Sequence, residues 1–170
     1  MVISKNIQKG FTIVELLIVI VVIGILAAIT VVAYSSIQQR ARDTVRKDDL
    51  TALAQVIRLY SVDKGDYVES GCGSTGNGWL PSDYDGAGPL ISINQCLLNG
   101  GYLSKVLTDP SGSSSCSGLS CYAYMKGSCP GGQYLYAHLD SLPQTSTDLD
   151  GTCNTAYDTL YGMNYILKVN

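Results

Sequence analysis

The sequence predicts an α+β protein in which a long N-terminal helix packs on a small antiparallel β-sheet with disulfide-linked loops. Three observations lead to this fold class. An uncharged, largely apolar run covers residues 16–39, an amphipathic stretch with helical spacing follows it, and short segments of alternating polarity lie near the C-terminus. The chain has 170 residues, and because a domain commonly takes roughly 100 to 200 residues, one folded domain is expected.

The apolar run is long enough to cross a membrane. Nearly every residue in 16–34 is apolar, and about 20 apolar residues span the roughly 30 Å of hydrocarbon in a bilayer. A cleavable secretory signal has a shorter apolar core, of about 7 to 15 residues, so this run is too long for one. Basic residues flank it on both sides and do not settle its orientation. Lys5 and Lys9 precede it, and it is followed by Arg40, Arg42, Arg46 and Lys47.

The helix is expected to continue beyond Ser36 as an amphipathic half. Its apolar residues recur at steps of three and four; they are Ile37, Ala41, Val45, Ala52, Leu53, Val56, Ile57 and Tyr60. The pattern ends near Val62, and Gly65 is placed to cap the helix in a left-handed conformation. The polar face mixes charge signs, which is typical of a solvated surface and also suits a contact with another chain. This face carries Arg40, Arg42, Asp43, Arg46, Lys47, Asp48 and Asp49.

After the helix, the sequence predicts a long loop and then a short second helix. Residues 65–88 are rich in Gly, Ser and Asp, and we expect Trp79 and Leu80 to pin this loop as a small satellite core. Residues 94–102 form the short helix, and a turn follows at residues 109–112.

Three β-strands are expected near the C-terminus. Residues 121–126 and 133–139 alternate with the two-residue period of strands, and residues 127–132 between them predict the loop of an antiparallel hairpin. Residues 164–169 supply a third strand, and the sheet has room for a fourth. His138 is expected in the same sheet as an ordinary polar residue. Cross-strand aromatic pairs are expected from Tyr122, Tyr124, Tyr134 and Tyr136.

The six cysteines all lie in the C-terminal 100 residues: Cys72, Cys96, Cys116, Cys121, Cys129 and Cys153. An even number in a loop-rich segment indicates disulfides formed in an oxidising compartment, which places the C-terminal part outside the cytoplasm. Structural zinc is disfavoured because there is no CxxC pair and only one histidine. The sequence does not fix the pairing; we carry forward a sequential one, Cys72–Cys96, Cys116–Cys121 and Cys129–Cys153.

The charge balance and the motifs exclude several kinds of function. Residues 65–170 hold three Lys or Arg against nine Asp or Glu, a net charge of −6, so we expect no direct binding to nucleic acid. A lone His138, with no GxSxG, HExxH or phosphate-binding loop, predicts neither an enzyme nor a bound cofactor.

One carboxylate stands at the start of the apolar run. Glu15 is followed by 24 uncharged residues, and an ionised group inside a membrane costs on the order of 2.5 kcal/mol or more, so it usually has a partner and a purpose. The segment KGFTIVELLIVIVVIGILAAI, which contains Glu15, resembles the processing site and N-terminal helix of type IV prepilins and of the related type II secretion pseudopilins. The resemblance covers about residues 5–40.

The resemblance implies a processing step and a pilin fold. A prepilin peptidase would cleave between Gly10 and Phe11 and methylate the new amine of Phe11, and Glu15 would meet the amine of an incoming neighbouring subunit. Residues 1–10 are then the leader peptide, 11–36 the transmembrane and filament-core helix, 37–64 its amphipathic half and 65–170 the extracellular head.

The expected function is that of a type IV pilus subunit, a homo-oligomer that serves adhesion, motility or DNA uptake. Its implied partners are copies of itself, the prepilin peptidase, the pilus assembly machinery and, before assembly, the membrane. The alternatives are a type II secretion pseudopilin and a signal-anchored surface binding protein, which needs neither cleavage at Gly10 nor Glu15. Asp148 and Asp150 are weak calcium candidates, because related pseudopilins use such loops for calcium, but a solvated acidic loop is the preferred interpretation.

Overall fold

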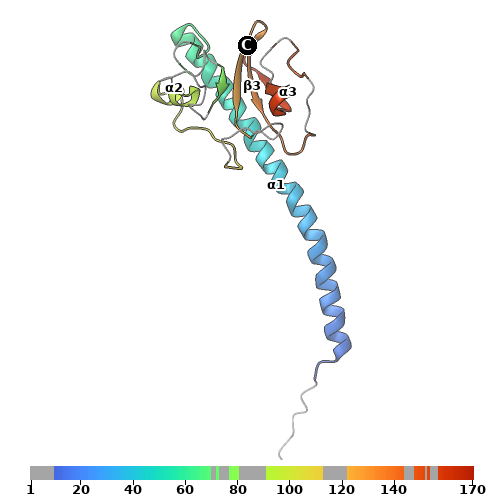
Figure 1. Cartoon of the computed structure of the whole chain (residues 1–170). Helices are drawn as coiled ribbons and strands as arrows, with labels where there is room; N and C mark the ends of the chain where they lie inside the picture. Colours follow the sequence, from blue (N-terminus) through green and yellow to red (C-terminus); the bar gives the residue numbers. More distant parts are fainter. Residues whose placement is uncertain are drawn as a thin grey trace, which may run out of the picture. The chain divides into compact units, whose positions relative to one another are not determined.

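The computed structural model describes residues 10–69, 72, 77–80, 91–112, 122–143, 148–151, 153 and 157–170, apart from the side chain of Val32 (Figure 1). The leader before Gly10, residues 81–88 of the predicted loop 65–88 and the predicted Cys116–Cys121 bridge lie outside these residues. The chain divides into two compact units, Met1–Gln38 and Gln39–Asn170.

Helix α1 covers Ile13–Lys64, as the apolar and amphipathic patterns predicted. It is long and apolar enough to cross a membrane. Gly65 follows it with a φ of 80°, and its N–H donates to the Ser61 carbonyl at 3.0 Å. The left-handed cap predicted from the glycine is therefore confirmed.

The unit Gln39–Asn170 contains a four-stranded antiparallel sheet in the order β1-β2-β3-β4. Its strands are β1 (Gly78–Trp79), β2 (Met125–Cys129), β3 (Gly132–Ala137) and β4 (Tyr165–Lys168). Two short helices accompany the sheet, α2 (Ile93–Asn99) and α3 (Tyr157–Tyr161). The α+β fold class is thus confirmed, with β1 and α3 as elements that the sequence pattern did not predict.

Both faces of the sheet are covered. On one face, Leu135 and Ala137 of β3 join a core with Leu53 and Ile57 of α1 and Leu97 of α2. The opposite face has its own smaller core, in which residues of β2 and β3 pack with α3, seen beside β3 in Figure 1; its members include Met125, Tyr136, Met163, Tyr157 and Tyr161. The two faces account for the alternating pattern of the strands.

The hairpin differs from its prediction in register. β2 begins at Met125 and runs to Cys129, so a two-residue turn replaces the predicted loop 127–132. Gly127 pairs with Tyr134, and Met125 pairs with Tyr136. The predicted cross-strand tyrosine pairs are therefore wrong, because Tyr134 faces a glycine and Tyr136 faces a methionine.

The loop and turn predictions had mixed outcomes. Leu80 is fully buried in the larger core, whereas Trp79 packs in the smaller one, with its ring 6.2 Å from that of Tyr161. The predicted satellite core is thus split between the two faces of the sheet. The turn at residues 109–112 is confirmed, since the N–H of Gly112 donates to the Asp109 carbonyl at 2.9 Å.

Candidate functional site

The first turn of α1 is closed by a reciprocal pair of hydrogen bonds. The backbone N–H of Thr12 donates to Glu15 Oε2 at 2.8 Å, and the backbone N–H of Glu15 donates to Thr12 Oγ1 at 3.2 Å. The Thr12 hydroxyl adds a third bond to Glu15 Oε2 at 2.7 Å. Thr12 precedes the first helical residue, so the arrangement is a capping box of the Thr-x-x-Glu type.

The capping box gives Glu15 a partner within its own chain. A helix leaves its first four N–H groups without partners in the helix, and this arrangement satisfies two of them while the carboxylate receives the threonine hydroxyl. Thr12 is a residue that the sequence reasoning missed, although the spacing Thr12-x-x-Glu15 is a readable signal. The predicted cleavage position, Gly10–Phe11, lies directly before this box.

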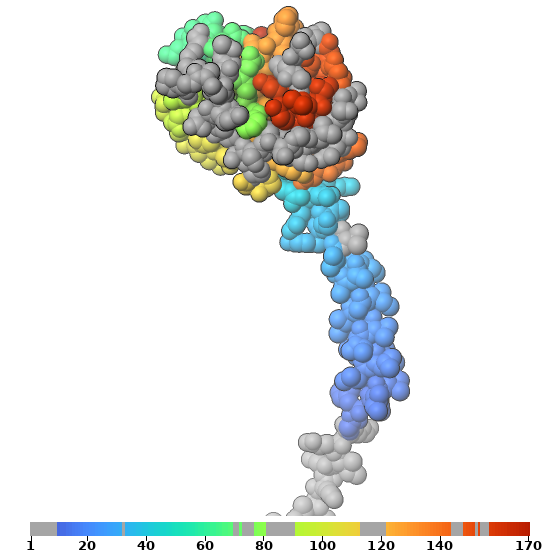
Figure 2. Space-filling view, in the orientation of Figure 1, coloured from blue at the N-terminus to red at the C-terminus, as the bar shows by residue number. Residues whose placement is uncertain are grey.

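Beyond the capping box, α1 presents an uncovered apolar surface. Every large apolar side chain described from Phe11 to Ile37 is at least 47% exposed. Figure 2 shows this part of α1 in blue, with its side chains open on the face in view. Such a continuous surface requires lipid or other protein chains to cover it.

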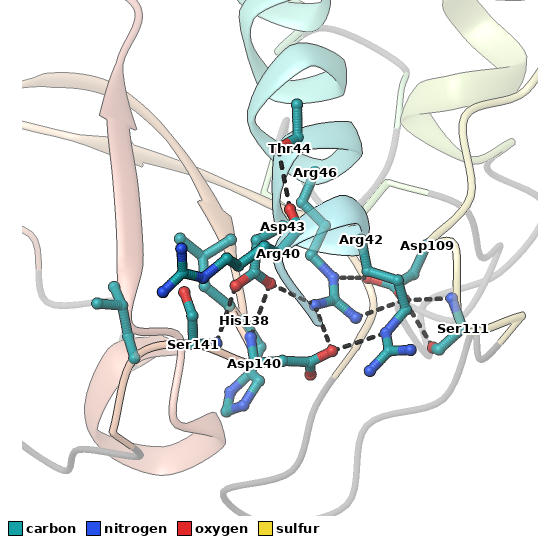
Figure 3. A network of polar contacts seen from close by, with 12 residues as sticks. Arg40, Arg42, Asp43, Thr44, Arg46, Asp109, Ser111, His138, Asp140 and Ser141 are labelled. Atoms are coloured by element: carbon teal, nitrogen blue, oxygen red, sulfur yellow. Dashed lines mark hydrogen bonds and ion pairs between the residues drawn. The ribbon is translucent and has the colours of Figure 1, made fainter. Parts of the chain in front are cut away.

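A second polar site lies where α1 meets two loops of the C-terminal unit (Figure 3). The guanidinium of Arg46 is fully buried and binds Asp109 with two bonds, Nε to Oδ2 at 2.7 Å and Nη2 to Oδ1 at 3.1 Å. Its Nη1 lies 2.8 Å from Asp43 Oδ1 and 3.2 Å from Asp140 Oδ2. We call Arg46 with these three aspartates the arginine clamp.

The arginine clamp also binds the backbone of the loop after β3. Asp43 accepts the N–H groups of Asp140 and Ser141, each at 2.8 Å. Burial alone would raise the pKa of Asp43, but the bonds from Ser141, Asp140 and Arg46 outweigh it and hold the pKa below its usual value. Asp43 therefore stays ionised and fixes this loop against α1.

The clamp corrects the prediction of a solvated polar face on α1. Arg40, Lys47 and Asp48 are exposed as expected, but Asp43 and Arg46 are buried. They are buried because aspartates from two distant loops supply the charges that Arg46 needs.

His138 follows β3 rather than lying in it, and it is buried. Its Nδ1 lies 2.9 Å from the Gly162 carbonyl, and its ring meets the edge of Tyr122 at 5.0 Å. These contacts explain the histidine as part of the packing.

The acidic loop brings three carboxylates together. Ligand oxygens of Asp148, Asp150 and Asp158 all lie within 4.8 Å of one another. Burial raises the pKa of Asp150, and the charges of Asp158 and Asp148 raise it further, although a hydrogen bond from Tyr136 opposes them. Asp158 thus lies beside the two calcium candidates.

Removing one of these charges is expected to stabilise the head. Asp148→Asn keeps an oxygen for the Gly151 N–H, which Asp148 Oδ1 accepts at 2.6 Å, and it removes repulsion worth a few tenths to about 1 kcal/mol at pH 7. Urea unfolding measures the change, with Asp48→Asn on the exposed face of α1 as the control. Equal midpoints for the two variants would contradict the prediction.

The same urea titration with added calcium distinguishes a calcium site from a solvated acidic loop. Only calcium that binds this loop would stabilise the wild type more than Asp148→Asn.

Among the residues that the structure describes, two disulfides fasten the C-terminal unit, one on each core. Cys72 is joined to Cys96 beside the larger core, and Cys129 is joined to Cys153 beside the smaller one. These are the partners that the sequential pairing proposed.

Comparison with known proteins found one family model and several relatives, each of which matches part of the chain. Residues 5–31 match the family model described as the prokaryotic N-terminal methylation motif. The type II secretion system core protein G of Pseudomonas aeruginosa is 40% identical over 60 residues, which cover 35% of this chain and 42% of that protein. The fimbrial protein EcpC of Eikenella corrodens is 32% identical over 108 residues, or 64% and 59% of the two chains.

A third relative is the type IV major fimbrial protein FimA of Dichelobacter nodosus, 34% identical over 80 residues, or 47% of this chain and 51% of that protein. The chain thus spans about half the length of these curated relatives. No solved structure matches it at a significant level. The methylation motif, the capped apolar helix, the disulfide-linked α+β head and these relatives agree, and the chain is similar to type IV pilins and to type II secretion pseudopilins.

Proposed function

We propose that the chain is the structural subunit of a type IV pilus, cleaved after Gly10, methylated at Phe11 and polymerised through residues 11–36 into a surface filament. The observation that carries this proposal is the uncovered apolar surface of α1, with Glu15 as the one charged group in its first turns. Relatives named as fimbrial proteins support a pilus.

Assembly exchanges one covering of the apolar helix for another. Before assembly, residues 11–36 lie in the membrane and lipid covers their side chains. In the filament, the same segments of neighbouring subunits take the place of lipid, and close packing between helices drives the exchange. The cysteines support a C-terminal head on the outer side of the membrane, where disulfides form.

Glu15 sets the register of the incoming subunit. Cleavage after Gly10 creates a positively charged amine on Phe11, one helical turn before Glu15. When the amine of one subunit meets Glu15 of the next, two charges that apolar surroundings disfavour compensate each other. Thr12 holds the carboxylate in the capping box until that partner arrives.

The pilus role requires a prepilin peptidase and an assembly machinery as partners. The assembled filament would function in adhesion, motility or DNA uptake. The second candidate is a type II secretion pseudopilin, because the type II secretion system core protein G of Pseudomonas aeruginosa is among the relatives. A pseudopilin would remain within the cell envelope, whereas a pilin dominates filaments sheared from the cell surface. An anchored binding protein would remain uncut in the membrane.

Intact mass and N-terminal peptide mapping of sheared surface filaments test the proposal. We expect a dominant chain that begins at Phe11, carries one added methyl group and lacks the six thiol hydrogens of its cysteines. A chain that begins at Met1 and occurs only in the membrane would contradict it and favour the anchored binding protein.

A further inference from the structure

Four polar side chains gather on the inner face of the β2–β3 hairpin, the face that carries Leu135 into the larger core. Lys126 is fully buried and Gln133 is 5% exposed. Lys126 lies opposite Leu135, and Gln133 lies opposite Ser128, so Lys126 and Gln133 are diagonal neighbours on one face. Glu69, from the segment after α1, completes the group.

The hydrogen bonds align an amine, a carboxamide and a carboxylate. Lys126 Nζ donates to Gln133 Oε1 at 2.7 Å. On the other side of the same carboxamide, Gln133 Nε2 donates to Glu69 Oε1 at 2.7 Å and to Ser128 Oγ at 2.7 Å. The Ser128 hydroxyl in turn donates to Glu69 Oε1 at 2.5 Å.

Burial makes the lysine amine available as a nucleophile. It lowers the pKa of Lys126 to about 8, although the charges of Glu69 and Asp66 oppose the shift. The lowered pKa increases the fraction of chains that carry the neutral amine, which has the lone pair that the ammonium lacks.

We propose that Lys126 and Gln133 become joined by an isopeptide bond that covalently links β2 to β3. Lys126 Nζ attacks the carboxamide carbon of Gln133, and a C–N bond forms as the carbonyl electrons move to Oε1. The proton lost by the attacking nitrogen passes to Oε1, the atom that Nζ already contacts, and Glu69, which lies on Nε2, relays it from the intermediate to Nε2. The bond from carbon to Nε2 then breaks, ammonia leaves, and the carbonyl re-forms. No oxidant, reductant or cofactor is consumed.

Each neighbour has a role in this step. The paired strands hold the amine beside the carboxamide, and such positioning replaces a bimolecular encounter with an intramolecular one. Glu69 lies on the leaving nitrogen, where a general acid has to act, and Ser128 fixes both the carboxylate and the amide. The alternative is a buried lysine satisfied by hydrogen bonds alone, which leaves Lys126 and Gln133 chemically unchanged.

Mass spectrometry of the full chain, reduced and digested with trypsin after denaturation, distinguishes the isopeptide bond from a lysine that is only hydrogen-bonded. An isopeptide bond blocks cleavage after Lys126, so residues 106–168 are recovered as one peptide, lighter than their composition by one ammonia. Asparagine cyclisation at residues 77 or 99 also releases ammonia, but it leaves Lys126 open to trypsin. Complete cleavage after Lys126, with residues 127–168 at their unmodified mass, would overturn the proposal.

Variants assign the roles within the site. Lys126→Met is expected to abolish the loss of ammonia, and Glu69→Gln, which keeps a similar shape, is expected to lower the linked fraction at least tenfold. Ser128→Ala, the matched control, keeps amine, carboxamide and carboxylate, so its linked fraction should fall less than that of Glu69→Gln. A linked fraction in Glu69→Gln equal to that of the wild type would overturn the role given to Glu69. The wild-type digest decides the bond itself, whether or not a variant folds.

Discussion

Replacing Glu15 with alanine is expected to leave a stable precursor in the membrane and to reduce surface filaments at least tenfold. In the proposed assembly, the variant loses the carboxylate that pairs with the amine of an incoming subunit, so that amine would enter apolar surroundings without compensation. It also loses the bonds to Thr12, which weakens the start of the helix. Immunoblots of sheared filaments and of membranes measure both pools.

Two matched variants separate the two roles of Glu15. Glu15→Gln keeps an oxygen for the Thr12 N–H but removes the charge, so it should assemble about as poorly as Glu15→Ala. Thr12→Val removes the hydroxyl and keeps the charge, so it should retain more filaments than either. Abundant normal filaments from Glu15→Ala would refute the assembly role, and a loss of the precursor itself would point to a structural role instead.

Replacing Arg46 with alanine is expected to destabilise the C-terminal unit by about 3–5 kcal/mol, the typical effect of removing one partner from a buried charge cluster. Three aspartates would then face one another without the guanidinium that compensates them. Urea unfolding of the full chain in detergent measures the change, followed by the fluorescence of Trp79, the one tryptophan of the sequence.

Arg42 provides the matched control for Arg46. It also binds Asp140, with Nε 2.7 Å from Oδ2, but its side chain is 35% exposed. Because solvent screens such a pair, Arg42→Ala should cost no more than about 1 kcal/mol. Similar losses for the two variants would contradict the central place of Arg46 in the clamp.

Arg46→Ala and Arg42→Ala should also differ in the pH at which acid unfolds them. Burial alone would raise the pKa of Asp140, but its hydrogen bond from Arg42 and the charge of Arg46 outweigh it, and the pKa is lowered, as it is for Asp43. Carboxylates with lowered pKa values stabilise the fold above their unfolded value near 4, and this contribution disappears as the pH falls through the folded value. Without Arg46, acid unfolding should begin at higher pH.

Features set by local pattern were predictable from the sequence. The long uncharged run and the apolar residues spaced three and four apart predicted α1, and Gly65 predicted its end. Both signals are local, because a helix is recognised by its apolar period and by its capping residues. The Thr12–Glu15 box carried a local signal as well, but the unusual position of Glu15 drew attention to a partner on another chain. A capping partner three residues away was therefore overlooked.

Features set by distant contacts were not predictable. In the sequence, Asp43 and Arg46 look like charges on a solvated helix face. Only the folded structure brings Asp109 and Asp140 beside Arg46. The register of the hairpin likewise depends on which face of each strand meets α1. A glycine-rich stretch offers little side-chain pattern to fix it, so Gly127 was assigned to a loop rather than to β2.

The two cores and their bridges also bear on how the head can change in evolution. Cys72–Cys96 secures the face that meets α1, and Cys129–Cys153 independently secures the face that meets α3. Substitutions around α3 can accumulate without disturbing the packing on α1, since the sheet separates the two sets of contacts. The α3 side of the sheet can therefore vary in sequence more freely than the side that packs on α1.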